Sequence, residues 1–418
     1  MADAEKYDLI IIGAGAAGLS AAIRAAEETD SILVLEYEKT PGGVLDQCIH
    51  PGFFGEELQK TGPEYSSYLY EKAKEKGVRF RFGAFVTGIE GDTAAFLTAA
   101  GEERAAARAF ILASGCREKH FGELGILGSR SAGIYTGGEA QKLLNLRGLD
   151  IGDDFVIVGG GDIGMIIARR LRLLGKNMVC IVEAAQECGA MPKNQMLCQR
   201  ELGIPLITGS IAASVHGSPR ISSVTLKNLQ TGEKREERCG ALIIAAGLVP
   251  DDELDTGEKN IFVCGNAKHI CPSVEEVRRD AEQAAADAVS YIKTGVRPER
   301  SDNYTAPQRV KLRDGEKACP LCHNGCVMKS ENGAVTGAKC PRGEEFFRRD
   351  QGKRYYSLAL PVEGAEGALP VRTDRPATFA AVAALFQELK NKPVKGPVRA
   401  GDVIYSGDDF ALVACKSF

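Results

Sequence analysis

Two segments of the chain repeat one pattern of apolar run, glycine-rich turn and helix. In the first, an aliphatic run at residues 9–12 is followed by three glycines in a G-x-G-x-x-G spacing and an alanine-rich stretch at 16–28. Short apolar runs bounded by glycine are typical of strands that are buried on both faces. A further apolar run at residues 32–35 predicts a second such strand. The segment therefore predicts a strand, a turn, a helix and a strand in succession.

The glycine-rich turn of this first unit predicts a dinucleotide-binding site. Gly13 permits a tight turn, Gly15 lets a pyrophosphate approach the backbone, and Gly18 lets the helix pack closely on the strand. The start of the helix offers N–H groups and a partial positive charge to phosphates. Glu36 follows Gly18 by 18 residues, where it can accept hydrogen bonds from ribose hydroxyls. This context favours a binding site over a purely structural turn.

The second unit, at residues 154–183, has the same parts. Gly159, Gly161 and Gly164 follow an apolar strand, a helix is predicted over 162–174, and Glu183 closes the next strand. A carboxylate there bonds a ribose 2′-hydroxyl and repels a 2′-phosphate, which favours NAD(H) over NADP(H).

The helix of the second unit carries three arginines. Arg169, Arg170 and Arg172 lie in its second half, and we interpret them as a solvated helix face rather than as a phosphate site.

The residues around these units alternate between strand and helix patterns. Helices are predicted at 63–76 and 275–291, a linker at 297–308, and strands at 78–82, 84–90, 94–98, 109–118, 241–246 and 260–266.

Composition sets limits on the class of protein. A chain of 418 residues is long enough for about two or three domains. Its 44% hydrophobic and 26% charged residues are typical of a soluble globular protein, and its net charge of −4 gives no reason to expect nucleic acid as a partner. There is no secretory signal pattern and no apolar run long enough to span a membrane, so we expect a cytoplasmic protein.

The C-terminal region, residues 309–418, has a different character. It holds five of the 13 cysteines, and four of them, Cys319, Cys322, Cys326 and Cys340, have a C-x2-C-x3-C-x13-C spacing. Zinc sites usually draw two compact pairs, whereas a compact triplet with one remote ligand is typical of iron–sulfur sites. We therefore expect a [4Fe–4S] cluster, with structural zinc or a [2Fe–2S] cluster as alternatives. A helix near 377–390 and a closing pair of strands at 397–405 and 410–414 complete the region.

Together these motifs resemble the pyridine-nucleotide–disulfide oxidoreductase superfamily over the first ~300 residues. The resemblance rests on GAGAAG with Glu36, LASG ending at Gly115, GGGDIG with Glu183, IIAAG ending at Gly247, and VCGN ending at Asn266. It implies an α/β fold with two Rossmann-like, three-layer ββα dinucleotide-binding domains and a small C-terminal α+β cysteine-rich domain. The implied limits are 1–118 and 249–298 for a discontinuous FAD domain, 119–248 for the NAD(P)H domain and 309–418 for the C-terminal domain.

The resemblance also implies which residues hold the cofactors. Those expected at FAD are Gly13, Gly15, Ala16, Ala17, Gly18, Glu36, Gly43, Ser114, Gly115, Gly265 and Asn266, the last standing where the family usually has Asp. Those expected at NAD(H) are Gly159, Gly161, Asp162, Ile163, Gly164, Glu183 and Gly247.

One departure from the superfamily concerns its redox dithiol. Disulfide reductases carry a C-x4-C pair after the first acid or a C-x2-C pair before the second nucleotide site, and this chain has neither. Cys48 stands alone in the first region. A single thiol near this position cycles through sulfenic acid in the NADH oxidase and peroxidase branch, so Cys48 is a candidate catalytic residue. We favour the interpretation of a packing cysteine.

The C-terminal region resembles an uncharacterised domain family marked by a CxxC motif and, locally, the iron–sulfur segment of molybdopterin oxidoreductases. Relatives with this arrangement accompany glycerol-3-phosphate dehydrogenase-like flavoproteins, which implies a partner dehydrogenase. The leading hypothesis is an NADH-linked flavoprotein that exchanges electrons between NADH, FAD and the cluster. The alternatives are an NADH oxidase or peroxidase that uses Cys48 and has a structural zinc tail, and a non-catalytic assembly subunit.

Overall fold

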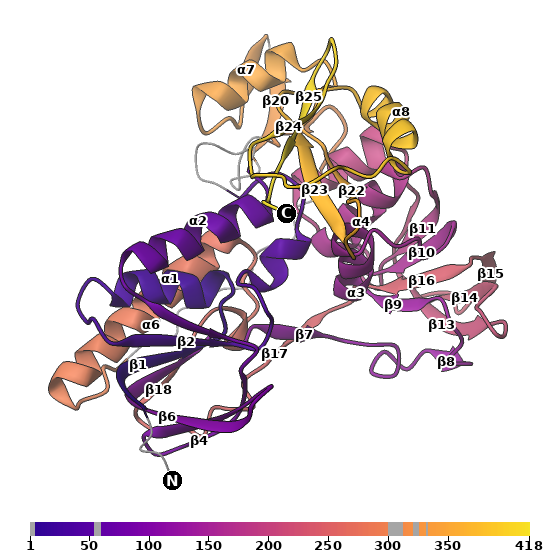
Figure 1. Cartoon of the computed structure of the whole chain (residues 1–418). Helices are drawn as coiled ribbons and strands as arrows, with labels where there is room; N and C mark the ends of the chain where they lie inside the picture. The colour runs from indigo at the N-terminus through magenta and orange to yellow at the C-terminus, as the bar shows by residue number, and fades with distance from the viewer. Residues whose placement is uncertain (1–4, 54–59, 300–311, 321–325, 332) are drawn as a thin grey trace. The chain divides into compact units, whose positions relative to one another are not determined.

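The computed structural model of the chain describes residues 5–53, 60–299, 312–320, 326–331 and 333–418 (Figure 1). The chain divides into two units. Unit 1 consists of Met1–Asp46, Pro63–Arg117 and Leu248–Pro307. Unit 2 consists of Gln47–Gly62, Glu118–Gly247 and Gln308–Phe418.

Unit 1 is built on a central parallel sheet. Strand β1 pairs in parallel with β2 on one side and β6 on the other, and β3 extends the sheet beyond β2. The other edge of β6 pairs with antiparallel β5 along its first half and with parallel β18 along its last residues, and β4 pairs with β5. The strands are β1 (Glu5–Ile12), β2 (Ile32–Glu36), β3 (Arg79–Phe82), β4 (Phe85–Glu90), β5 (Thr93–Thr98), β6 (Gly101–Leu112) and β18 (Ile261–Val263), with the short pair β7 (Cys116–Glu118) and β17 (Leu248–Pro250). The helices are α1 (Ala16–Ala25), α2 (Gly62–Glu75) and α6 (Val274–Thr294), with 3-10 turns at Gly43–Gln47 and Gly265–Ala267.

Unit 1 has three layers, and alternate side chains of β1 pack against the layers on the two faces of the sheet. Ile10 and Ile12 lie in one core with Val86 and Phe96 of the β4–β5 hairpin. Successive side chains of a strand point to opposite faces, so the buried Leu9 and its neighbours on β1 face the other way, toward α1 and α6. Figure 1 shows these helices on one side of the sheet and β4 on the other.

The second nucleotide unit repeats this division into layers inside unit 2. Its parallel sheet has the order β12-β11-β10-β16-β9. Phe155 of β10 packs with Met165 of α4, whereas its neighbour Val156 packs with Val215 and Val224 of a second sheet, β15-β14-β13-β8. The strands are β8 (Leu127–Gly128), β9 (Ile134–Thr136), β10 (Asp154–Val158), β11 (Asn177–Val182), β12 (Leu206–Ile207), β13 (Ser210–His216), β14 (Ser223–Asn228), β15 (Lys234–Arg238) and β16 (Ala241–Ile244). The helices are α3 (Gly137–Gln141), α4 (Asp162–Leu173) and α5 (Pro192–Gln195), with π-helical segments at Lys142–Leu146 and Met196–Glu201.

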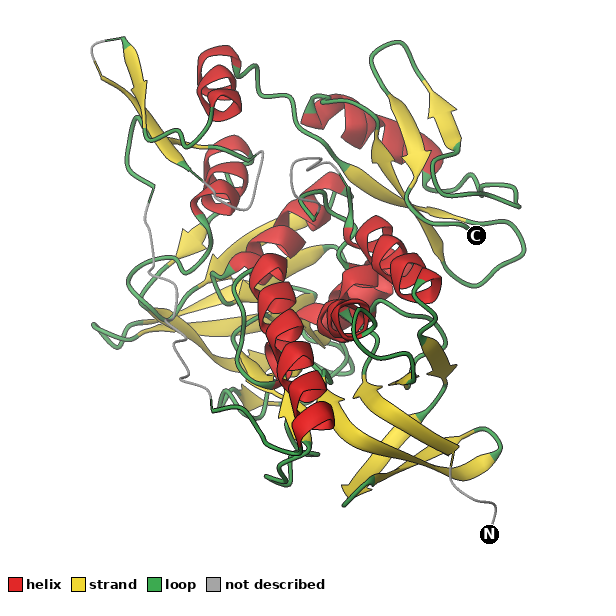
Figure 2. Ribbon diagram, turned by 90° about the vertical axis from the view of Figure 1, so that its left-hand side faces the viewer, coloured by secondary structure: helices red, strands yellow, loops and turns green. Residues whose placement is uncertain are grey.

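The C-terminal part of unit 2 shares a core with the end of α4. An antiparallel sheet of order β22-β23-β25-β24 carries α8, and the two are seen beside the label C in Figure 2. Leu173 of α4 lies in one cluster with Leu358, Phe386 and Leu412 of this region. The elements are β19 (Lys317–Ala318), β20 (Val327–Glu331), β21 (Ala334–Thr336), α7 (Pro341–Arg349), β22 (Ser357–Pro361), β23 (Ala368–Thr373), α8 (Phe379–Leu389), β24 (Val403–Ser406) and β25 (Ala411–Ala414).

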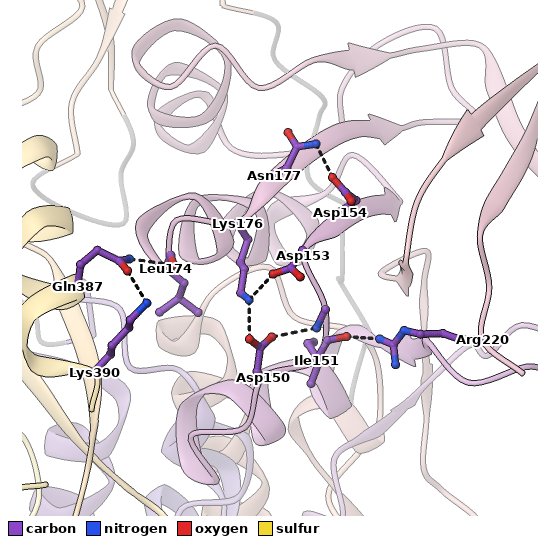
Figure 3. A network of polar contacts seen from close by, with 11 residues as sticks. Asp150, Ile151, Asp153, Asp154, Leu174, Lys176, Asn177, Arg220, Gln387 and Lys390 are labelled. Carbon is purple, nitrogen blue, oxygen red and sulfur yellow. Dashed lines mark hydrogen bonds and ion pairs between the residues drawn. The ribbon is translucent and has the colours of Figure 1, made fainter. Parts of the chain in front are cut away.

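Polar contacts surround the same junction (Figure 3). Gln387 of α8 donates a hydrogen bond to the carbonyl oxygen of Leu174 at 3.3 Å. Lys176, just beyond the end of α4, pairs with Asp150 at 2.6 Å and Asp153 at 2.8 Å. Burial alone would lower the pKa of Lys176, but its bonds to the two carboxylates outweigh burial and raise that pKa. The lysine therefore stays charged in this partly buried place.

The predicted elements agree with the structure except at some boundaries. The strand predicted at 109–118 is only the end of a longer strand, because β6 begins at Gly101 and stops at Leu112. Its first residues are polar and lack an apolar run, but they pair with β5 in an antiparallel ladder. Residues 300–308 of the predicted linker lie outside the described residues. Within the described ranges, every helix is too short or too polar to cross a membrane.

The shared core predicts that α4 stabilises the C-terminal sheet. We expect Leu173→Ala to lower the free energy of unfolding by about 2–5 kcal/mol, because it removes a buried side chain from that cluster. Leu149→Ala is the control, because Leu149 is 52% exposed and its loss should cost less than about 0.5 kcal/mol. Urea unfolding followed by circular dichroism measures both, and equal stability of the two variants would contradict the shared core.

Candidate functional site

The three glycines of the first turn have different reasons to lack a side chain. Gly13 has a φ of +102°, and a Cβ there would lie 2.5 Å from the carbonyl oxygen of Ala113. A Cβ on Gly18 would lie 1.8 Å from the carbonyl oxygen of Gly13. At Gly15, by contrast, no described atom lies within 4 Å of an added Cβ. The chain itself requires glycine at 13 and 18, whereas the open space at Gly15 fits a cofactor that approaches the backbone.

The carboxylate of Glu36 faces this turn from the end of β2. Its Oε2 accepts a hydrogen bond from the Ala14 N–H at 2.7 Å, and its Oε1 accepts one from the Glu38 N–H at 2.8 Å. Burial raises the pKa of Glu36, although these backbone hydrogen bonds oppose the shift. Gly43 lies against the same turn, because a Cβ there would be 3.4 Å from the Gly15 Cα.

The remaining residues expected at FAD lie at the ends of neighbouring strands. Ser114 follows β6 beside Gly13 and donates a hydrogen bond to the carbonyl oxygen of Asp251, and Gly115 has a φ of +86°. Gly265 packs on α1, since a Cβ there would lie 2.8 Å from the Cβ of Ala17. The side chain of Asn266 is held by the chain itself: its Oδ1 accepts from the Cys271 N–H at 2.9 Å.

One residue near this site escaped the sequence reasoning. Asp280 of α6 accepts a hydrogen bond from the Gly265 N–H at 2.7 Å and so fixes the turn after β18. In the sequence, the only indication of this contact is an acidic residue within a helix that is rich in alanine.

The second glycine turn repeats the geometry of the first. A Cβ on Gly164 would lie 2.2 Å from the Gly159 carbonyl oxygen. Gly159 has a φ of +112°, and a Cβ there would lie 2.2 Å from the Ala245 carbonyl oxygen. No described atom lies within 4 Å of a Cβ added to Gly161. Glu183 accepts hydrogen bonds from the Gly160 N–H at 2.8 Å and the Ala185 N–H at 2.9 Å. The open space again coincides with the position expected to face a pyrophosphate.

Three further residues expected at NAD(H) make contacts within unit 2. Asp162 Oδ1 accepts from the Met191 N–H at 2.8 Å and from Asn194 at 2.6 Å, which ties the following loop to α4. Ile163 packs against the core of unit 2. Gly247 has a φ of +110° and accepts a hydrogen bond from the Lys119 N–H at 3.0 Å. Asp162 and Ile163 thus also have structural roles in unit 2.

Cys48 lies in unit 2, just after the turn Gly43–Gln47. Its thiol lies 3.9 Å from Oε1 of Gln141 in α3, and it donates a hydrogen bond to that oxygen. An amide oxygen accepts only from the protonated thiol, so this contact gives no support for a catalytic thiolate. The segment before the second glycine turn, residues 119–158, contains no cysteine.

Several other cysteines are packing residues. Burial raises the pKa of Cys180, Cys198 and Cys239 to about 12, so these thiols stay protonated near neutral pH. Buried protonated thiols are inert in redox exchange. The nucleotide-binding sheet of unit 2 therefore offers no reactive dithiol from these positions.

A hairpin brings together two cysteines of the C-terminal set. Cys319 and Cys326 follow β19 and precede β20, and the Cys319 N–H donates to the Cys326 carbonyl oxygen at 2.8 Å. Both belong to one buried cluster with Met328. Cys340 is the N-cap of α7, and a Cβ on Gly343 in the first turn of that helix would lie 3.8 Å from the Cys319 Sγ.

Cys322 lies outside the described residues. Among the described side chains, no three of His, Cys, Asp or Glu come close enough together to hold a metal ion. The donor set of soft thiolates suits iron–sulfur or zinc chemistry, and the hairpin accounts for two of its four members.

The interpretation of Arg169 and Arg170 as a solvated helix face is wrong. Both are half-buried and line a cavity beside the C-terminal residues Tyr356 and Ser357, whereas Arg172 is exposed as expected. Their face of α4 is covered by a segment almost 200 residues further along the chain, and no local pattern signals such a contact.

The two glycine turns, each with an acid on the adjacent strand, define a protein with two dinucleotide-binding folds. Residues 7–272 match the family described as pyridine nucleotide-disulphide oxidoreductase, and the chain belongs to that family. It is an FAD-dependent NAD(P)H oxidoreductase of the thioredoxin reductase-like type. The region after residue 272 lies beyond this match.

Individual relatives and solved structures are similar to part of the chain. The chain is 28% identical to the thioredoxin reductase of Mycolicibacterium smegmatis over 289 residues, which cover 68% of this chain and 89% of the relative. It is 24% identical to the ferredoxin–NADP reductase of Picrophilus torridus over 328 residues, with 71% and 96% covered. The structure of Lactococcus lactis thioredoxin reductase is similar with a TM-score of 0.58 and 24% identity, covering 69% of this chain and 99% of that one.

The different surroundings of Gly164 and Gly161 predict different effects of an alanine at each position: a loss of stability at Gly164 and a loss of coenzyme binding at Gly161. We expect Gly164→Ala to lower the free energy of unfolding by about 1–3 kcal/mol, because its Cβ would meet the backbone of Gly159. Gly161→Ala should change stability by less than about 0.5 kcal/mol. It should still weaken coenzyme binding about tenfold or more, because its Cβ takes the space of the pyrophosphate.

Thermal unfolding and steady-state KM for the nicotinamide coenzyme measure the two effects. A Gly161→Ala variant with unchanged KM would refute the placement of the pyrophosphate at this turn.

Proposed function

We propose that the protein is an NADH-linked flavoprotein that passes electrons between NADH, FAD and a C-terminal [4Fe–4S] cluster, to or from a partner flavoprotein dehydrogenase. The observation that carries the proposal is the hairpin that pairs Cys319 with Cys326 beside the helix capped by Cys340. It stands in a family member whose segment before the second nucleotide site lacks a cysteine pair.

The residues of the two glycine turns would hold the nucleotides. The open space at Gly15, the start of α1 and the carboxylate of Glu36 would take FAD, and the open space at Gly161 with Glu183 would take NADH. A bound flavin takes two electrons as a hydride and can release them singly, which suits a one-electron acceptor. The chain's own groups position the nucleotides, and hydride transfer itself needs no acid or base from them.

The cysteine spacing supports iron–sulfur over zinc. Three thiols within eight residues and a remote fourth, followed by Pro341, are typical of iron–sulfur ligation. Cys340 is the N-cap residue of α7, directly before Pro341. Zinc stays the alternative outcome of the metal analysis described below.

The partner is inferred from chemistry and from relatives. One relative is a ferredoxin–NADP reductase, and ferredoxins carry electrons on iron–sulfur clusters. Here the cluster would belong to the same chain, so a partner would meet it directly. The resemblance of the C-terminal region favours a glycerol-3-phosphate dehydrogenase-like flavoprotein as that partner.

The carboxylate of Glu183 predicts a preference for NADH. We expect kcat/KM for NADH to exceed that for NADPH, because a fixed negative charge repels the 2′-phosphate. Glu183→Gln should shift the ratio toward NADPH about tenfold or more. Glu187→Gln, an exposed acid four residues away, is the control and should leave the ratio unchanged. Equal ratios in the two variants would contradict the assignment of Glu183.

The cluster is tested by purification of the full chain without oxygen. We expect one FAD and roughly four iron and four sulfide ions per chain, with a broad visible absorbance that bleaches together with the flavin bands when NADH is added. Cys326→Ala should lose iron, whereas Cys415→Ala, in the same C-terminal region, should keep it.

Two results would overturn the relay. One zinc ion and no iron per chain would exclude it, and a flavin that NADH fails to reduce would favour an assembly subunit. The variant Cys48→Ser removes the thiol that the oxidase or peroxidase alternative requires, and it leaves the C-terminal cysteines unchanged. We expect its NADH–dye reductase activity to match the wild type, and loss of that activity would favour the oxidase alternative.

A further inference from the structure

Unit 2 contains two adjoining cavities where α4 meets the C-terminal residues. The larger has a volume of about 560 Å³. The smaller has a volume of about 60 Å³. Arg169, Leu202, Tyr356 and Phe379 line both. The glycines of the second nucleotide turn and Glu183 are not part of either wall, so these cavities are distinct from the expected coenzyme site.

Arg169 has an uncompensated charge at the junction of the cavities. Within the described ranges, its guanidinium makes no hydrogen bond or ion pair, although the side chain is half-buried. The nearby acid Glu201 is bound by Arg354, which also pairs with Asp350 at 2.6 Å. A half-buried cation without an ion-pair partner favours the binding of an anion beside it.

The smaller cavity adds a second cation and no acid. Arg170 donates to Asn145 Oδ1 at 3.0 Å and to the Ser357 carbonyl oxygen at 3.1 Å, both of them uncharged acceptors. Burial lowers the pKa of Arg170 to about 9, which still leaves it charged near neutral pH. The described residues of this wall include no Asp or Glu. Arg169 and Arg170 therefore give this wall a net positive charge.

Two buried polar atoms in this wall also lack partners. The Ser357 hydroxyl and the Gln47 Oε1 make no hydrogen bond to any described group, and Ser357 is only 6% exposed. Most buried polar atoms in folded proteins are hydrogen-bonded, so each orphan atom calls for an explanation. Both atoms are covered by other atoms of the chain, so they lie behind the cavity surface rather than open to it.

The side chains that line both cavities together with Arg169 are apolar or aromatic. Leu202, Phe379 and the ring of Tyr356 form much of the surface shared by the two cavities. Pockets with apolar walls and a few fixed polar groups suit organic molecules better than free inorganic ions. A planar guanidinium matches a carboxylate through two parallel hydrogen bonds.

We propose that these cavities bind a small organic carboxylate, whose carboxyl group pairs with Arg169 and whose body lies against Phe379 and Tyr356. The site is independent of the cluster and of the assignment of the nucleotides, so it stands whether or not the electron relay exists.

The binding test uses the full-length chain and a panel of sodium salts: benzoate, lactate, succinate and inorganic phosphate. We expect at least one carboxylate to bind in isothermal titration, and Arg169→Gln to weaken that binding roughly tenfold or more. Arg172→Gln is the matched control on the exposed side of the same helix and should bind like the wild type. Arg169→Lys keeps the charge without the fork, and it should fall between the wild type and Arg169→Gln.

A second measurement separates loss of binding from loss of folding. Arg169→Met removes the uncompensated charge and keeps a long side chain, so its unfolding temperature without ligand should equal or exceed that of the wild type. The carboxylate that binds the wild type should raise the unfolding temperature of the wild type only.

Three results would overturn the proposal. The first is that no carboxylate of the panel binds with a Kd below about 10 mM, which is already weak binding. The second is that a carboxylate binds equally well to Arg169→Gln. The third is that phosphate binds through Arg169 more tightly than every carboxylate, which would assign the site to phosphate groups instead.

Discussion

The contact on which both nucleotide folds depend is the close approach of a helix to the turn before it. A Cβ at Gly18 or Gly164 would lie 1.8 Å or 2.2 Å from a carbonyl oxygen of the same turn. Any side chain would push the helix away and displace the N–H groups at its start. The adjacent acids, Glu36 and Glu183, each bond one amide of the turn and so depend on the same geometry. The middle glycine alone is free of this constraint, because no described atom lies within 4 Å of a Cβ added there.

Helix α4 joins three features of unit 2. It begins at the second glycine turn, and its last residues lie in the core of the C-terminal sheet. Between them, Arg169 and Arg170 face the cavities beside Tyr356. A helix is rigid over this length, so the turn, the cavities and the C-terminal sheet have fixed positions relative to one another. The C-terminal region is thus part of the same folded unit as the nucleotide-binding sheet.

The cysteines divide according to their surroundings. Cys180, Cys198 and Cys239 are buried among apolar side chains, where burial keeps them protonated. Cys319 and Cys326 are held side by side by the backbone of a hairpin, next to the helix that Cys340 begins. The same residue type therefore serves packing in one region and suits ligation in another. This difference follows from local backbone geometry as well as from sequence spacing.

The sequence by itself determined both strand–turn–helix units, since Gly18 and Gly164 each contact a glycine five residues earlier in the same turn. Gly13 and Gly159 lie instead against distant residues, Ala113 and Ala245. The same local logic predicted the helix near 377–390 and grouped Cys319 with Cys326. The tertiary structure decided the rest. It extended β6 back to Gly101 through pairing with β5, engaged the side chain of Asn266 with the Cys271 amide, and buried Arg169 beneath the C-terminal region. These outcomes depend on which distant segment covers a surface, and the spacing of residues along one helix or strand carries no information about that segment.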